Sequence, residues 1–297
     1  MKVIFHGDDF GLTPGVNHGI ISAFKEGLLT STSLMAVGEA AEEAMDLALE
    51  NSGLDVGIHL VLSDEPPLLT PEVLSTLISR HGLLPSRNRI LRAIFSRKLD
   101  YGQVEAEWCA QVEKVLSTGI KISHLDSHQF VHLFPGLFTV CRHLTRRYNI
   151  PFIRNAMIEP FLSNSLIDPG IGRLVQWFGL WGWTRFMTLK GCFPSGATIP
   201  SVGFLNAGGR MDCATVLKTL DKLAKNKRCS RLEFILHPGV GDNHTHNKYK
   251  HWRYFWENDL SLLLNHDLRK GLEMRNIKTT SFPAVVATLA ESAGKER

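Results

Sequence analysis

The chain has 297 residues, of which 44% are hydrophobic and 21% are charged, and its formal net charge is +4 at pH 7. These values are typical of an ordinary soluble globular protein with room for one large α/β domain or two small ones. The net charge is mild, and the Lys/Arg clusters are interrupted and do not alternate with aromatic residues, which argues against a nucleic-acid partner.

Five scattered cysteines without a Cys-x-x-Cys pair argue against both a disulfide framework and a structural zinc site. The chain passes from one lysine directly into an apolar run, which leaves no room for a signal peptide. Its longest apolar segment, residues 174–183, is shorter than the about 20 residues that span a bilayer. We therefore expect a cytoplasmic protein.

Predicted strands and helices alternate in the first part of the chain. Strands are predicted over residues 2–11, within 28–37 and over 55–62, with helices over 16–26 and 38–51 between them. This order is typical of a parallel sheet with crossover helices. The looser segment 63–85, which is rich in proline, is typical of a lid or a substrate loop.

Helices are predicted next over residues 88–99, 103–118 and 134–148, and strands over 121–126, 151–154, 231–236 and 278–281. Asp212 is predicted to cap a helix that ends at Lys225. The aromatic segment 176–183 favours a core helix, and an apolar surface for a lipid or a membrane is the alternative. No linker or repeat is visible, so we predict one domain over residues 1–297.

The first predicted strand ends in two adjacent carboxylates, Asp8 and Asp9. Side chains alternate along a strand, so the two cannot both point into one core. Two buried carboxylates are costly without a positive partner, and a divalent metal ion is the usual one. One carboxylate would bind the metal, and the other would be free to act as a base.

Three other predicted strands also carry polar residues at or near their ends: His59 lies late in one, the segment 126–128 ends the next, and His237 ends a later one. The carboxyl ends of parallel strands gather at one face, where active sites form. Asp, His and His suit zinc or another divalent ion. Such an ion polarises a carbonyl and lowers the pKa of water, while a carboxylate takes a proton and a histidine supplies one. The pattern predicts metal-assisted hydrolysis and leaves the bond open.

Four motifs in order carry a resemblance: Asp-Asp-Phe-Gly at 8–11, Gly-Ile-His-Leu at 57–60, His-Leu-Asp-Ser-His-Gln at 124–129 and His-Pro-Gly at 237–239. Together they resemble the YdjC-like (ChbG-type) carbohydrate deacetylase family over nearly the whole chain. The resemblance implies an α/β fold of the deformed TIM-like (β/α) barrel type. It also implies hydrolysis of the N-acetyl group of an amino sugar.

The resemblance further implies roles for individual residues. Asp9, His59 and His128 match the ligands of a divalent metal ion, either Mg²⁺ or Zn²⁺. Asp8 matches the general base and His237 the catalytic acid. Arg154 would orient the base. The residues expected to bind substrate are Asn17, Asp126, Phe130, His132, Glu159 and Trp256.

One position departs from the family pattern, because Phe130 stands where many members have a histidine. Other stretches resemble the hopanoid-biosynthesis-associated branch, which would act on an N-acetylglucosaminyl lipid. We therefore expect an N-acetylated sugar or glycolipid as substrate, and we leave contact with a membrane and a homodimer open.

Two alternative functions remain open on the sequence. The first is a metal-dependent hydrolase of a phosphoester or glycosidic bond. Hydrolysis of a glycosidic bond would need two carboxylates beside the bond, and Asp126 and Glu159 are the candidates. The second is a carbohydrate-binding relative without catalytic activity, which the departure at Phe130 suggests.

Overall fold

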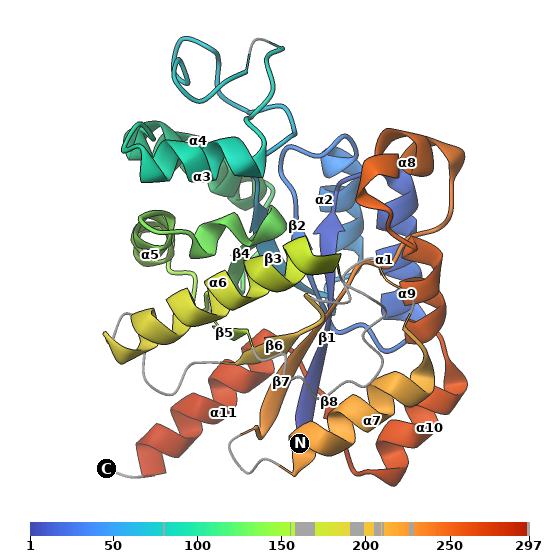
Figure 1. Cartoon of the computed structure of the whole chain (residues 1–297). Coiled ribbons are helices and arrows are strands. Elements are labelled where there is room, and N and C mark those ends of the chain that lie inside the picture. The colour runs from blue at the N-terminus through green and yellow to red at the C-terminus, as the bar shows by residue number, and fades with distance from the viewer. Residues whose placement is uncertain are drawn as a thin grey trace. The chain divides into compact units, whose positions relative to one another are not determined.

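The computed structural model describes residues 1–297 except 80, 155, 158–169, 191–198, 205–208, 210, 226–228 and 296–297 (Figure 1). The chain divides into two compact units. Unit 1 comprises residues 1–8, 15–32 and 154–297, and unit 2 comprises residues 9–14 and 33–153. The prediction of a single domain over 1–297 stays a prediction.

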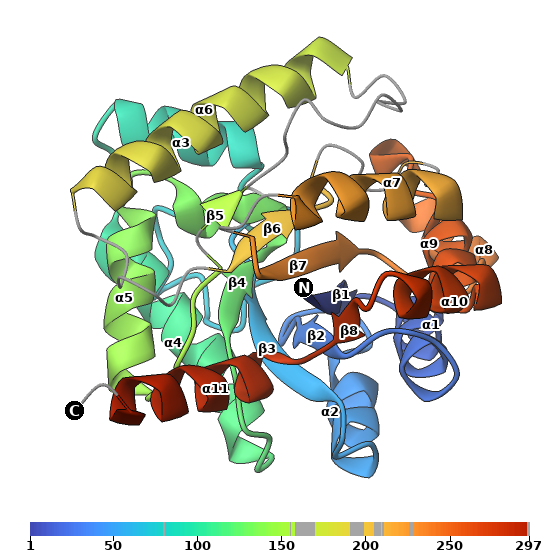
Figure 2. The same ribbon diagram turned by 90° about the horizontal axis from the view of Figure 1, so that it is seen from below.

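Strands β1 (Lys2–Phe10) and β2 (Ser31–Leu34) each contribute residues to both units. In unit 1 the strand order is β2-β1-β7-β6-β5, with β8 also paired to β1; β7 is Arg231–Leu236, β6 Pro200–Val202, β5 Ala156–Met157 and β8 Lys278–Thr279. The printed pairings of β1, β7, β6, β5 and β8 are parallel. Figure 2 shows β5, β6 and β7 side by side. The register of β1 on β7 sets Ile4 opposite Glu233.

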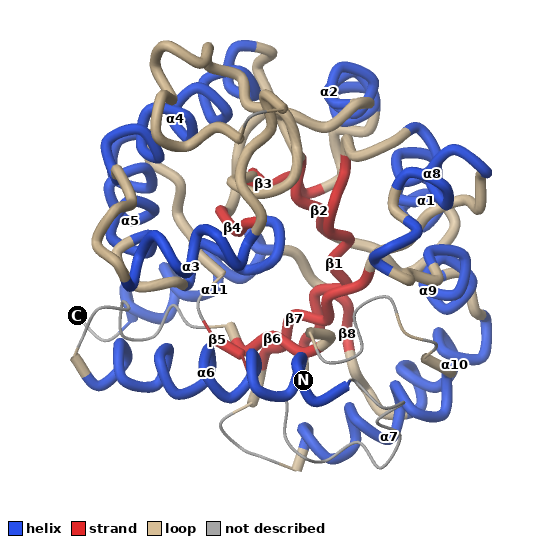
Figure 3. The backbone as a smooth tube through the Cα atoms, turned by 45° about the horizontal axis from the view of Figure 1, so that its top comes forward, coloured by secondary structure: helices blue, strands red, loops and turns tan. Residues whose placement is uncertain are grey.

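The helices of unit 1 are α1 (Pro14–Lys25), α6 (Gly170–Leu189), α7 (Cys213–Ala224), α8 (Asn243–Lys248), α9 (Trp256–Leu263), α10 (His266–Met274) and α11 (Phe282–Lys295), with a short 3₁₀ helix, η2, at Lys250–Trp252. Asp212 caps α7 as predicted, because its carboxylate accepts a hydrogen bond from the Thr215 N–H at 2.7 Å. Helices α7 and α10 lie side by side (Figure 3). The fully buried side chains of Phe5, Leu220 and Phe282 belong to the core of this unit.

Unit 2 has the strand order β4-β3-β2-β1, in which β3 is Asp55–Leu60 and β4 is Leu125–Ser127. Strands β3 and β4 are parallel, and their register sets His59 opposite Asp126. The helices of unit 2 are α2 (Ala41–Glu50), α3 (Arg87–Phe95), α4 (Tyr101–Ser117) and α5 (Leu137–Arg147), with the 3₁₀ segment η1 at His128–Leu133. Trp108 on α4 is fully buried, and its indole N–H donates to the Val61 carbonyl.

Most predicted elements are confirmed within a few residues, including β1, β3, β7 and the helices on either side of residue 100. The predicted strand over 151–154 is wrong in position. Ile153 forms only an isolated bridge to Leu125, and β5 begins at Ala156. Proline at position 151 has no N–H to give to a ladder, which weakens pairing at the start of this segment.

The predicted helix over 176–183 is confirmed as part of α6. Trp177 and Leu180 are buried, whereas Phe178 and Trp181 are exposed, so only one face of this helix packs against the protein. Within the described part of the chain, no helix is both long and apolar enough to cross a bilayer.

Candidate metal and catalytic site

Unit 2 brings Asp9, His59 and His128 together, the three residues expected to bind a metal ion. Each offers one ligand atom, and these atoms lie within 4.8 Å of one another. Asp9 Oδ1 lies 3.2 Å from His59 Nε2 and 2.9 Å from His128 Nδ1. All three side chains are buried. Buried His/Asp ligands at these spacings could hold a divalent metal ion.

Asp126 orients His59 from behind. Its Oδ1 lies 2.7 Å from His59 Nδ1, and Ser33 Oγ lies 2.9 Å from the same nitrogen. An ionised carboxylate can only accept a hydrogen bond, so Nδ1 carries the proton and Nε2 keeps its lone pair for a metal. A carboxylate behind a ligating histidine is the usual outer partner in metal sites. Asp126 is fully buried, and its expected role in substrate binding stays a prediction.

The donor set fits a cation on two further observations. His59 Nε2 and Asp9 Oδ1 are both electron-pair donors at 3.2 Å from each other, an arrangement that a positive ion between them stabilises. The other oxygen of Asp9, Oδ2, is buried and has no hydrogen-bond partner among the described residues. A buried carboxylate oxygen in this state is costly unless a cation binds it.

Asp9 is held in its charged form. Burial opposes ionisation, but hydrogen bonds and charge interactions with the His128 and His59 rings, when these are protonated, outweigh it, so the pKa of Asp9 lies far below its ordinary value. With the rings neutral, a cation bound at Asp9 would act in the same direction. Its backbone is also unusual, with φ at 68° in the left-handed region. Aspartate tolerates this region better than most residues, and strained backbone of this kind gathers at functional sites.

The segment after His128 is strained as well. Gln129 and Phe130 have φ of 55° and 57°, which is rare for a bulky aromatic residue. The Phe130 ring stacks on His132 at 6.2 Å between centroids, and His132 Nδ1 lies 2.6 Å from Ser127 Oγ. Phe130 and His132 are both buried. Their expected contact with substrate stays a prediction.

Unit 1 holds the expected base and its arginine. The Arg154 guanidinium donates to both oxygens of Asp8, at 3.0 and 2.8 Å, in a bidentate pair. It also donates to Glu233 Oε1, at 3.0 Å from Nε and 2.7 Å from Nη2. His6 Nε2 lies 3.2 Å from Asp8 Oδ1. These four buried residues form one network that fixes the orientation of the Asp8 carboxylate.

The expected acid, His237, ends β7 in the same unit. Its backbone N–H donates to Asp259 Oδ2 at 2.9 Å, and its ring meets the Tyr254 ring edge-on at 4.8 Å. Asp259 is buried, and its Oδ1 has no hydrogen-bond partner among the described residues. Burial is the largest influence on Asp259, and it raises the pKa of this carboxyl to about 7. Asp259 therefore joins helix α9 to the end of β7.

A pocket of about 240 Å³ adjoins this histidine through Tyr254 and is lined by His246, Asn247, Tyr249, Lys250, Arg253, Tyr254 and Trp256. Trp256, one of the expected substrate residues, packs against Tyr254 with ring centroids 5.6 Å apart, and its side chain is almost fully buried. Asn17 is fully buried on α1. Glu159 lies outside the described residues.

Sequence reasoning missed Glu233, Asp259 and Ser33, and it assigned no role to His6. A signal existed for Glu233 and His6, because each is a polar residue between two buried apolar residues or glycines of a strand. Charged residues are rarely buried without a partner. Nothing in the sequence names that partner, since Arg154 and Glu233 are 79 positions apart.

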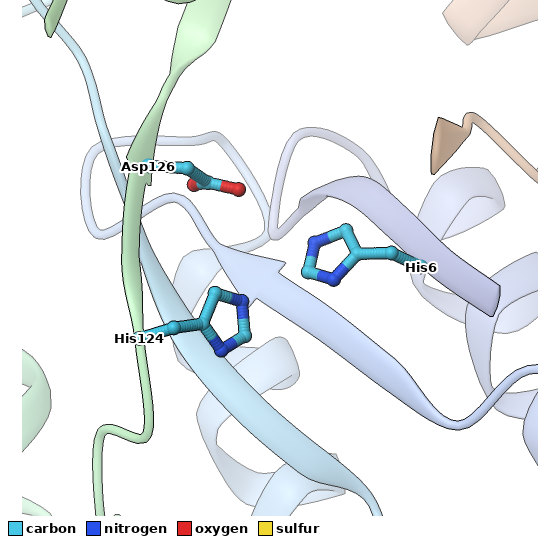
Figure 4. Close-up of side chains that lie close together, drawn as sticks. All are labelled: His6, His124 and Asp126. Carbon is cyan, nitrogen blue, oxygen red and sulfur yellow. The ribbon is translucent and has the colours of Figure 1, made fainter. Parts of the chain in front are cut away.

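One more buried histidine, His124, precedes β4. Figure 4 shows His124 and Asp126 on the same side of their segment, as expected for residues two apart in extended backbone, and it also draws His6, which extends from β1. His124 Nδ1 lies 2.7 Å from Ser123 Oγ. A Cβ atom on Gly57 would lie 2.3 Å from His124 Nε2, so the imidazole occupies space that only glycine leaves open.

The model of one protein family, described as "YdjC-like protein", matches residues 2–274. The chain belongs to the YdjC-like protein family. It is similar to a carbohydrate deacetylase of Listeria welshimeri, with 37% identity over 54% of this chain and 64% of that protein. It is also similar to a carbohydrate deacetylase of Geobacillus stearothermophilus, with 41% identity over 50% of this chain and 57% of that protein. The chain thus spans less than two thirds of the length of these relatives.

A crystal structure from Enterococcus faecalis, of a protein assigned provisionally to cellobiose-phosphate cleavage, matches this YdjC-like chain with a TM-score of 0.71. The match covers 96% of this chain and 98% of that protein at 23% sequence identity, so it bears on the fold alone. It confirms the predicted fold class, an α/β fold with parallel strands of the deformed TIM-like type. The hopanoid-associated branch is not distinguished by these comparisons.

Proposed function

We propose that this YdjC-like protein is a metal-dependent deacetylase that removes the N-acetyl group from an amino sugar or a glycolipid. The observation that carries the proposal is the buried Asp9–His59–His128 triad, with Asp126 behind His59 and an unbonded oxygen on Asp9. The two carbohydrate deacetylases that resemble the chain support the same reaction class.

A bound divalent ion would polarise the acetyl carbonyl and lower the pKa of a water molecule. Two imidazoles with one carboxylate suit zinc better than magnesium, because magnesium prefers oxygen ligands and keeps several waters. We therefore propose Asp9, His59 and His128 as ligands of zinc or a similar ion, with magnesium as the alternative.

We assign the proton transfers to the chain's own residues. Asp8 accepts a proton from water as the water oxygen attacks the acetyl carbon, and Arg154 holds the carboxylate in place through its bidentate pair. Asp8 and Asp9 are consecutive residues of β1, so their Cα atoms are about 3.8 Å apart. His237 donates a proton to the sugar nitrogen as the C–N bond breaks. The products are acetate and a free amino sugar.

The substrate class is proposed from the pocket beside His237. Tyr254 both lines this pocket and contacts the His237 ring, and aromatic walls with nearby polar groups are typical of small-molecule sites. We propose that it receives a ring of the sugar. A glycolipid of the N-acetylglucosaminyl type is the finer proposal. A homodimer and a cytoplasmic location are further proposals that rest on the sequence alone.

The decisive experiment measures acetate release from N-acetylated sugars and metal content by mass spectrometry on the same preparations. Asp8→Asn should bind metal as the wild type does and lose at least about 100-fold in turnover, because general base catalysis contributes that much. His128→Ala should lose the metal as well as the activity.

Full activity in Asp8→Asn would show that the base is assigned wrongly. Release of phosphate or of a free sugar, without acetate, would favour the hydrolase of another bond. Wild-type protein that binds a sugar but neither holds a divalent ion nor releases any product would favour the non-catalytic alternative.

A further inference from the structure

Helix α6 presents large apolar side chains to solvent. Val175 is 65% exposed, Trp181 45%, Phe186 47% and Leu189 76%. Residues 175, 178, 182, 186 and 189 follow the spacing of one helix face. Helices on the surface of a globular protein normally turn charged or polar residues outward, so this face has the reverse of the usual pattern.

The opposite face of α6 is buried, and the helix contacts β5 of its own unit. Trp177, Leu180 and Thr184 are buried, and they follow the spacing of a second helix face. Figures 2 and 3 show α6 along the outer side of β5 and β6. The helix therefore has a docked side and, over its described residues, a separate exposed apolar side. Large contiguous exposed apolar patches usually mark interaction sites.

The charged residues of the segment 174–190 are both positive. Arg185 lies on one margin of the face and Lys190 on the other, and residues 174–190 contain no aspartate or glutamate. The Lys190 ammonium lies 5.7 Å from the centre of the Phe186 ring, above the same face. Tryptophan, phenylalanine and leucine next to arginine and lysine are the residues that place a helix in the plane of an anionic membrane surface.

We propose that the exposed face of α6 docks on an anionic membrane surface. The residues that would enter the headgroup region are Val175, Phe178, Phe186 and Leu189, with Arg185 and Lys190 contacting lipid phosphates. A second copy of the chain fits this face less well, because a symmetric pair would bring its arginines and lysines together. The proposal is independent of the deacetylase activity, although a lipid-linked substrate would be reached at the same surface.

The test is cosedimentation of the full chain with vesicles of phosphatidylglycerol and phosphatidylcholine, compared with vesicles of phosphatidylcholine alone. We expect binding to the anionic vesicles only. The double variant Phe186→Glu/Leu189→Glu should lose binding by more than tenfold. Replacing Arg185 and Lys190 by Gln should weaken it by roughly fivefold for each charge.

The matched control is Met274→Glu, at a side chain that is 86% exposed on α10, and it should bind like the wild type. Circular dichroism and thermal unfolding of each variant show whether the fold is kept. Equal binding by Phe186→Glu/Leu189→Glu would overturn the proposal, as would wild-type protein that ignores anionic vesicles. A wild-type dimer that this variant dissociates would identify the face as a contact between copies instead. Acetate release from a water-soluble N-acetylated sugar should be unchanged in all α6 variants, which separates this test from that of the proposed function.

Discussion

In each unit, a buried carboxylate orients a side chain of the candidate site. Asp126 Oδ1 lies 2.7 Å from His59 Nδ1, where it sets the proton on that nitrogen and thereby frees Nε2. Glu233 Oε1 accepts two hydrogen bonds from Arg154, so the arginine meets Asp8 in one geometry. In both cases the carboxylate fixes the orientation of the side chain to which it is hydrogen-bonded, His59 or Arg154.

Asp126→Ala is expected to lower the metal affinity by 10- to 100-fold, because His59 loses the partner that fixes its ring. Asp126→Asn should have a smaller effect, since its amide oxygen can still accept from His59 Nδ1–H. Metal titration followed by calorimetry measures both. Equal affinities in Asp126→Ala and the wild type would show that Ser33 alone is enough to hold His59.

The raised pKa of Asp259 makes the stability of the protein depend on pH. Its pKa is raised to about 7 in the folded protein from an ordinary value near 3.8, so the folded state keeps the proton that the unfolded state releases. The contribution of Asp259 to the free energy of unfolding is therefore fully present below about pH 4, and it falls, by up to about 4 kcal/mol, as the pH rises through 7.

Asp259→Asn should remove most of this decline while still accepting the His237 N–H through its amide oxygen. Urea unfolding at pH 5 and at pH 8 measures the effect. The wild type should lose more stability between the two pH values than the variant does. Parallel losses in the two proteins would assign the pH dependence to other groups.

At the scale of elements, the turn after β7 is held by backbone contacts on both sides. The Gly239 N–H donates to the Trp256 carbonyl of α9, and the Val240 N–H donates to the Gly15 carbonyl of α1. Helix α1 approaches so closely that a Cβ on Gly19 would lie 2.3 Å from Gly239 Cα. His237 is thus positioned by the packing of a helix as well as by its own strand.

Gly19→Ala is expected to destabilise the protein by about 1–3 kcal/mol, because backbone has to move to admit the methyl group. Gly182→Ala is the matched control, since nothing lies within 4 Å of its Cβ position in α6. It should stabilise the protein by about 0.5–1 kcal/mol through the better helix propensity of alanine. Chemical unfolding of both variants tests the pair, and a neutral Gly19→Ala would contradict the close approach.

The elements that the sequence predicts well are those with local signals. The strand before His237 is mainly apolar, and His237 is followed by Pro-Gly. Asp212 stands immediately before a periodic helix. The strand over 151–154 is misplaced because pairing, rather than local propensity, decides where a short strand lies. The one-sided exposure of α6 is also beyond sequence reasoning, since its residues are apolar on almost every face.

At the scale of the molecule, the metal position exists only in the folded chain, because Asp9 and His128 are 119 positions apart in the sequence. The fold brings together Asp9, His59 and His128, which the strand-end motifs indicate as metal ligands. The motifs do not indicate that Asp126 orients His59, because that pairing exists only in the folded chain. Binding of an ion therefore favours the folded state over the unfolded one.

Zinc in 100-fold excess over its dissociation constant should raise the free energy of unfolding by about 2.7 kcal/mol. Thermal unfolding with and without a chelator measures the difference, and His128→Ala should show none. A chelator that leaves the melting temperature of zinc-loaded wild type unchanged would contradict a site at Asp9, His59 and His128.

The positive φ of Asp9 limits which residues this position accepts. Glutamate would keep a carboxylate but is poorly suited to left-handed backbone, while glycine would suit the backbone but bring no ligand. Asparagine suits the backbone and lacks the charge. Backbone and coordination chemistry thus select the same residue for separate reasons, and aspartate satisfies both. Any engineering of this site for another metal would be easier at His59 or His128, because neither is among the described residues with left-handed backbone.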